Sequence, residues 1–124
     1  MIGEQGWREL AGWERALIDR LLVSEFEGRD ELQQQLQDCR VRIVDKYDDN
    51  YGSLEFDVQS GPLAKTESVV ADGQAQDSDG IPIEVLLFVR DGKLHELEIY
   101  KADGTPIVRR PDAANLIVYK ELPT

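Results

Sequence analysis

The sequence predicts an α+β domain in which two N-terminal helices pack on one face of a curved, mainly antiparallel sheet of five to six strands. Three observations support this fold class. Apolar residues recur at helical spacing before Cys39, and from Cys39 onward their period changes to two. Residues 79–100 then contain two apolar runs joined by Asp91-Gly92, a dipeptide that strongly favours a two-residue hairpin turn.

The first helix is predicted over residues 12–23, with polar residues such as Glu14 on the side opposite its apolar stripe. That stripe is formed by Leu10, Trp13, Leu17 and Leu21. The second helix is predicted over residues 28–37, where Leu32 and Leu36 form a narrow apolar seam. Such a seam is typical of a partly exposed surface helix.

The first strands are predicted over residues 39–45 and 53–58, where apolar and charged residues alternate. If these two strands pair, one face carries two arginines and two acids, namely Arg40, Arg42, Glu55 and Asp57. A long, irregular strand is expected over residues 64–77, with a bulge near Gly73. Residues 111–114 suit a helical turn and residues 116–119 a final edge strand.

The central hairpin can be given a register. With regular pairing around Asp91-Gly92, one face carries Glu84, Leu86, Phe88, His95, Leu97 and Ile99. The other face carries Ile83, Val85, Leu87, Val89, Leu94 and Tyr100, together with Glu96 and Glu98. Both faces are apolar enough to be buried, whereas two helices cover only one. The second face is therefore expected to be a cleft or a docking surface.

Length and composition place limits on the function. The 124 residues predict a single domain over 1–124, and 25 acidic against 14 basic residues give a net charge of −11. This charge repels nucleic acid and anionic membranes, so we expect neither as a partner. The acidity either serves solubility alone or complements a basic protein partner.

Cellular location is predicted from what the sequence lacks. Its start has no basic or long apolar segment of the kind found in signal peptides, and no apolar run approaches the ~20 residues of a membrane span. The single cysteine, Cys39, excludes an intrachain disulfide. We therefore expect a cytoplasmic protein.

Residues that could carry chemistry are few. His95 is the only histidine and is expected to be structural, although Glu84 shares its face. Glu96 and Glu98 lie roughly 7 Å apart on one strand, a pairing that acid–base catalysis uses but that acidic strands also contain. The acids near the preceding turn lack the spacing of a calcium loop, and no glycine-rich phosphate loop is present. We expect no catalytic residue, no cofactor and no metal, and we do not expect an enzyme.

Four segments of the chain resemble an uncharacterised family of small, acidic bacterial domains. These segments lie at residues 14–22, 26–32, 79–83 and 97–106, and the most specific is the run Leu97-Glu98-Ile99-Tyr100 followed by Asp103-Gly104 and Pro106. Small acidic proteins of this kind resemble the immunity proteins of contact-dependent growth inhibition systems. That resemblance implies a cytoplasmic protein that neutralises a basic, nuclease-type toxin.

A toxin-neutralising role would place the partner-binding residues on exposed acids around the hairpin, with an aromatic anchor. The candidates are Asp72, Asp77, Asp79, Glu96, Glu98 and Tyr100. Two alternatives stay open. The first is a protein-binding domain that self-associates, for example as a homodimer, or has a regulatory role. The second is a small hydrolase-type enzyme that uses Glu96 with Glu98 or His95 with Glu84.

Overall fold

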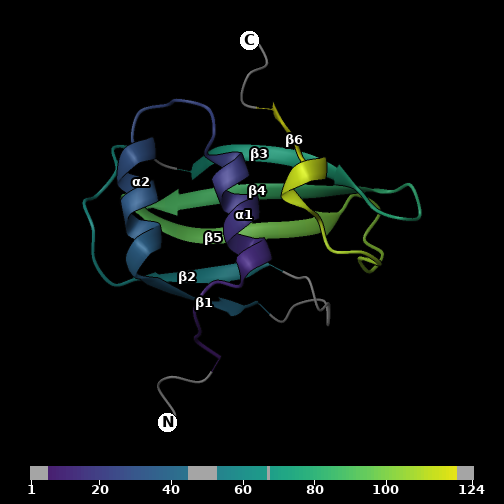
Figure 1. Ribbon diagram of the computed structural model, residues 1–124, viewed down its shortest axis with the longest axis horizontal. Helices are drawn as coiled ribbons and strands as arrows, with labels where there is room; N and C mark the ends of the chain where they lie inside the picture. The colour runs from purple at the N-terminus through teal and green to yellow at the C-terminus, as the bar shows by residue number, and fades with distance from the viewer. Residues whose placement is uncertain (1–5, 45–52, 67, 120–124) are drawn as a thin grey trace.

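The computed structural model describes residues 6–44, 53–66 and 68–119. Within them, two α-helices precede a six-stranded antiparallel sheet, as Figure 1 shows. The helices are α1 (Gly12–Leu21) and α2 (Arg29–Gln35), and short 3-10 turns follow as η2 (Leu36–Asp38) and η3 (Ala113–Asn115). The strands are β1 (Cys39–Ile43), β2 (Leu54–Val58), β3 (Ser68–Gln76), β4 (Pro82–Arg90), β5 (Lys93–Lys101) and β6 (Ile117–Val118).

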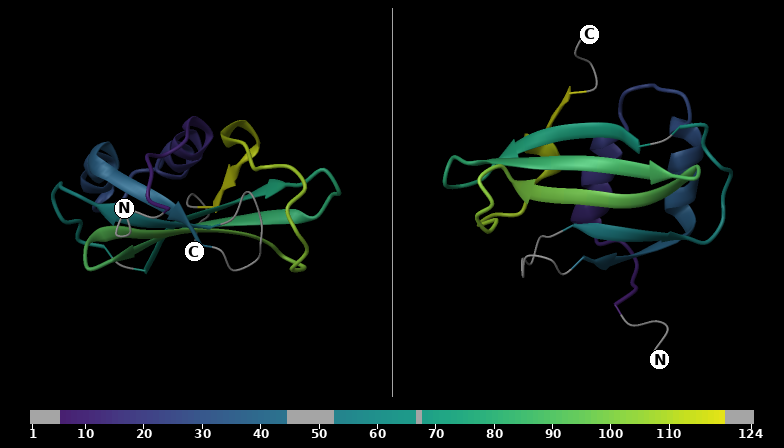
Figure 2. Two further views of the ribbon diagram at one scale, coloured as in Figure 1. Left: turned by 90° about the horizontal axis from the view of Figure 1, so that it is seen from below. Right: turned by 180° about the vertical axis from the view of Figure 1, so that it is seen from behind.

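The strand order is β1-β2-β5-β4-β3-β6, so the hairpin of β4 and β5 lies at the centre of the sheet. Both helices, η3 and the segment leading into β6 lie on one side of the sheet, as the edge-on view in Figure 2 (left) shows. We call this side the inner face and the opposite side the outer face. The core lies between the helices and the inner face, which confirms the α+β fold predicted from the sequence.

Of the predicted apolar stripe, Leu17 and Leu21 are 0% exposed, as is the neighbouring Ile18. The other two members, Leu10 and Trp13, are half-buried and pack against the core. The prediction that Glu14 lies on the exposed side is wrong. Glu14 accepts hydrogen bonds of 2.8 and 2.7 Å from the Arg8 guanidinium and one of 2.8 Å from the Ala11 N–H. An acid three residues into a helix can reach back to the first free N–H groups, and here that contact buries it.

Helix α2 holds the hairpin turn through Gln35, which is 0% exposed. Its amide Nε2 donates to the carbonyls of Pro62 and Gly92, at 2.8 Å each. Its Oε1 accepts from the Leu94 N–H at 2.9 Å. The sequence predicted a surface helix here, and two of its three consecutive glutamines are indeed exposed, but the third is a buried bridge between α2, β5 and the loop before β3.

The turn itself is as predicted, because Asp91 and Gly92 have φ of 54° and 78° and Arg90 pairs with Lys93. The register beyond it is not. Val89 pairs with Leu94, but Phe88 pairs with Glu96, so His95 is an extra residue in β5. This β-bulge reverses the faces of the following residues in β5 relative to the regular pairing.

The bulge corrects the predicted face assignment. Leu97 and Ile99 pair with Leu87 and Val85 on the inner face, and all are buried. The second apolar face expected from the sequence is therefore the covered one. Glu96 and Glu98 do not interrupt it, because they pair with Phe88 and Leu86 on the outer face.

Strand β3 is also bulged, at Val70 rather than near Gly73. Gly73 has a different role. A Cβ atom there would lie 2.7 Å from the Ile117 carbonyl oxygen, so the glycine allows β6 to approach β3 closely. The predicted final edge strand is present as β6, and the predicted helical turn before it is present as η3.

Candidate functional site

The outer face of the sheet lies opposite the layer that carries the helices. Seen from behind in Figure 2 (right), the strands lie in front of both helices, and no described segment crosses over them. The register places three rows of side chains across this face. They are Glu55-Glu96-Phe88-Val69, Glu98-Leu86-Asp72 and Tyr100-Glu84-Gln74.

The charges on the outer face divide into paired and unpaired groups. At the β1–β2 end, Arg42 lies 2.9 Å from Glu55, and Arg40 lies 3.5 Å from Asp57, as the sequence predicted. None of the ion pairs among the described residues involves Glu96, Glu98 or Asp72. The centre of the face is therefore rich in carboxylates that have no cation from the described chain.

Like charges meet at one point of this face. Glu55 and Glu96 are directly opposite each other on β2 and β5, an arrangement that costs stability in an antiparallel pair. Arg42 offsets the repulsion between these carboxylates only at Glu55, because its guanidinium contacts that residue. A cation on a partner would offset the repulsion at Glu96.

Apolar side chains lie among these acids. Leu86 and Phe88 are half-buried in the middle of the face, although no helix covers them. Val69 is 42% exposed beside Phe88, and Tyr100 is 39% exposed on β5. Burial together with the charges of Glu84 and Glu98 raises the pKa of Tyr100, so its hydroxyl stays protonated and able to donate a hydrogen bond.

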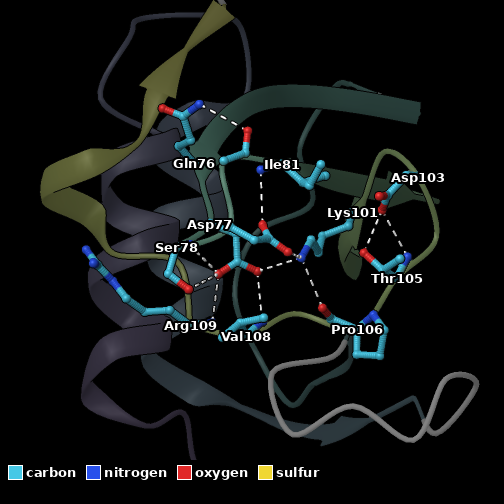
Figure 3. Close-up of polar contacts among 12 residues, drawn as sticks. Gln76, Asp77, Ser78, Ile81, Lys101, Asp103, Thr105, Pro106, Val108 and Arg109 are labelled. Atoms are coloured by element: carbon cyan, nitrogen blue, oxygen red, sulfur yellow. Dashed lines mark hydrogen bonds and ion pairs between the residues drawn. The ribbon is translucent and has the colours of Figure 1, made fainter.

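The predicted acids at the β3–β4 turn have a different environment, drawn in Figure 3. Lys101 at the end of β5 is buried, and its Nζ lies 3.1 Å from Asp77 and also pairs with Asp79. The same ammonium donates to the Pro106 carbonyl at 3.1 Å. Asp77 accepts the Val108 N–H at 2.8 Å, so the cluster fastens the segment after β5 to the β3–β4 turn.

The ionic form of this cluster is strongly favoured. Burial alone would raise the pKa of Asp77, but hydrogen bonds from the Val108 N–H, Lys101, the Ser78 N–H and the Arg109 N–H outweigh it and lower the pKa to about 2. Burial would likewise lower the pKa of Lys101, yet its bonds to Asp79 and Asp77 raise it. The pair is charged at neutral pH and suits a structural tie better than proton transfer.

A shallow, open depression of about 640 Å³ adjoins this tie. Its lining is polar and apolar in about equal measure, and its polar residues include Gln74, Gln76, Ser78, Arg109 and Asn115. Two of them already have partners, since Gln74 donates to Glu84 at 2.9 Å and Gln76 donates to the Gly80 carbonyl at 3.2 Å. These two amides are therefore already engaged within the chain.

The structure thus separates the six predicted binding residues. Asp72, Glu96, Glu98 and Tyr100 come together on the outer face, where the three acids are half-buried rather than fully exposed as predicted. Asp77 does not, because it is 4% exposed, and the expectation that it is an exposed acid is wrong. Asp79 is partly exposed but pairs with Lys101.

Sequence reasoning missed Leu86 and Phe88 as parts of the same surface as Glu96 and Glu98. A bulge at His95 is the reason, and His95 carries no strong sequence signal for one. Burial raises the pKa of the Cys39 thiol to about 11, so that thiol is poorly reactive. Among the described residues, no group of three or more His, Cys, Asp or Glu side chains is placed to hold a metal ion.

Within those residues, no helix is both long and apolar enough to cross a membrane. Neither a curated protein nor a solved structure matches the chain. One family model does match, over residues 7–111, which include both helices and strands β1 to β5. By this match, the chain belongs to the family described as Domain of unknown function (DUF6984).

Proposed function

We propose that this chain is a protein-binding module whose outer face docks on a basic protein. The observation that carries the proposal is a sheet face that no described segment covers, combined with carboxylates at Glu96, Glu98 and Asp72 that form no ion pair with the described residues. Complementary charge accelerates association and suppresses wrong partners. A net charge of −11 adds a long-range attraction for such a partner.

Within this class, we propose an immunity protein that neutralises a nuclease-type toxin of a contact-dependent growth inhibition system in the cytoplasm. A nuclease must bind phosphates and therefore carries a basic surface, which an acidic sheet can cover. The small, ordered scaffold and the resemblance noted in the sequence support this assignment. The docking residues would be Glu96, Glu98, Asp72 and Tyr100, while Asp77 and Asp79 would act only by shaping the turn.

Self-association through the same face is less well supported. The half-buried Leu86 and Phe88 favour it, but two copies meeting there would bring their carboxylates together. Sedimentation across a range of protein concentrations tests this alternative. A dimer that Leu86→Ser abolishes would favour self-association over toxin binding.

The proposal predicts that a nuclease-type toxin domain is encoded beside this chain, and the decisive test is binding to that domain, together with protection of cells that express it. A double charge reversal, Glu96→Lys with Glu98→Lys, should weaken binding by about tenfold or more. The matched control is Glu25→Lys with Glu27→Lys, which makes the same charge change at two exposed positions before α2. Absence of micromolar binding and of protection would refute the proposed function.

A further inference from the structure

The three rows on the outer face have a pattern as well as a charge. Leu86 pairs with Glu98 on one side and with Asp72 on the other, which gives the order acid, apolar, acid across three strands. The adjacent row has Glu55, Glu96, Phe88 and Val69, which gives two acids followed by two apolar residues. Both rows run perpendicular to the strands, so a partner that matches them must cross the strands.

The spacing of these rows favours one kind of partner segment. Neighbouring strands lie about 4.8 Å apart, so the acid, apolar and acid positions follow one another at about that interval. Side chains three or four residues apart on one face of a helix are about 5–6 Å apart. Alternate side chains on an extended strand are separated by roughly 6.8 Å. This exceeds the spacing within a row by about 2 Å at each position, so an extended segment would not match the rows.

We propose that the outer face binds a basic amphipathic helix of the partner protein, laid across β5, β4 and β3. An apolar side chain of that helix seats on Leu86 and Phe88. Lys or Arg side chains one turn to either side pair with Glu98 or Glu96 and with Asp72. This inference rests on the proposed function only in taking the partner to be a protein.

Side-chain chemistry gives the two parts of the site different tasks. Leu86 and Phe88 are half-buried already, so a side chain seated on them excludes water from a small apolar centre, where binding energy usually concentrates. The carboxylates that flank this centre are half-buried as well, and they mainly set the rate of association and its dependence on salt. Tyr100 borders the site next to Glu84 and can donate a hydrogen bond to the helix.

The probes for the test are three synthetic peptides of equal charge. The first carries Lys and Leu at helical spacing, the second replaces each Leu by Ser, and the third rearranges the first so that Lys and Leu alternate. Binding is measured by calorimetry, and the contacted residues are mapped from amide chemical shifts in the ¹⁵N-labelled protein. We expect the first peptide to bind at least about tenfold more tightly than the other two, with shifts concentrated on β3, β4 and β5.

Two variants locate the contact. Leu86→Ser should remove most of the preference for the first peptide over the Ser peptide, whereas Leu63→Ser, at a position 60% exposed outside the sheet, should leave it intact. Equal binding of all three peptides, or shifts confined to the helices, would overturn the inference even if Leu86→Ser failed to fold.

The peptides also separate this inference from the proposed function. If the protein prefers the helical Lys/Leu peptide but does not bind the toxin domain, the docking mode is supported and the immunity role is refuted. If the protein binds the toxin with unchanged affinity after Leu86→Ser and Phe88→Ser, the immunity role is supported and the docking mode is refuted.

Discussion

Replacement of Gln35 by Ala should be among the most damaging single changes to a polar residue of this fold. It removes three hydrogen bonds, which connect α2 to the Pro62 carbonyl, the Gly92 carbonyl and the Leu94 N–H. These losses are unequal. Pro62 is exposed, so water can replace its partner, and the Gly92 carbonyl still accepts from the Ala64 N–H at 2.9 Å.

The largest cost comes from the Leu94 N–H. Leu94 is 3% exposed and lies past the end of the pairing between β2 and β5, where the amide of Gln35 takes the place of a neighbouring strand. A buried donor left without a partner costs about 1–3 kcal/mol, and each of the other bonds contributes up to about 1 kcal/mol. The expected loss in the free energy of unfolding is therefore about 2–4 kcal/mol.

Urea denaturation followed by circular dichroism measures this loss, with Gln34→Ala as the matched control. Gln34 is the exposed neighbour on the same helix, so its replacement should change the free energy of unfolding by less than about 0.5 kcal/mol. Gln35→Met keeps the volume of the side chain but not its hydrogen bonds, and it should be nearly as destabilising as Gln35→Ala. If Gln35→Ala matched Gln34→Ala, the bridging role of this amide would be refuted.

Three further predictions concern the tie at the turn, the bulge and the edge strand. Asp77→Asn should destabilise the protein by about 2–4 kcal/mol at neutral pH, since it removes charged hydrogen bonds from a buried site. The folded pKa of Asp77 is about 2, below its ordinary 3.8, so this stabilisation is complete above about pH 4 and is lost as the pH falls toward 2. The stability of the Asp77→Asn variant should therefore lack this loss between about pH 4 and pH 2 when it is measured against pH. Leu97→Ala should cost about 2–4 kcal/mol in urea denaturation and Leu86→Ala clearly less, whereas equal costs would contradict the bulged register. Gly73→Ala should destabilise by about 1–3 kcal/mol because its Cβ would lie 2.7 Å from a backbone oxygen of β6, while Gly12→Ala, with nothing within 4 Å, should be neutral or stabilising in the same assay.

Local sequence signals predicted the elements well. The helical spacing of Leu17 and Leu21 predicted α1 and the residues that it buries. Alternation of apolar and charged residues predicted strands at β1 and β2, and predicted that their arginines and acids share a face if the two strands pair, as they do. Asp91-Gly92 predicted the central turn because positive φ at two successive positions is a property of the residues themselves.

The candidate site was only partly predictable. Of the six residues predicted to form one binding surface, Asp72, Glu96, Glu98 and Tyr100 lie near one another, whereas Asp77 and Asp79 pair with Lys101. Leu86 and Phe88 were assigned to the face opposite Glu96 and Glu98. That assignment assumed that successive residues of β5 alternate between the two faces without an insertion. One extra residue in β5 moved every later side chain to the opposite face.

Buried polar residues were the other source of error. Gln35, Glu14 and Asp77 all have sequence neighbours typical of exposed positions, yet each is at most 4% exposed. Each is buried because its side chain satisfies groups on another segment of the chain. A sequence pattern indicates hydrophobicity and period, but it does not show which distant N–H or ammonium group will need an acceptor.

The sequence by itself therefore determined the fold class, the order of helices and strands, the central turn and the strongly acidic balance, because these depend on local propensity, period and composition. Only the tertiary structure decided which face of the hairpin is covered and which acids stay free. That decision depends on the bulge at His95, which turns Leu97 inward and Glu96 and Glu98 outward, and on Lys101, whose buried charge holds Asp77 at the turn and away from the outer face.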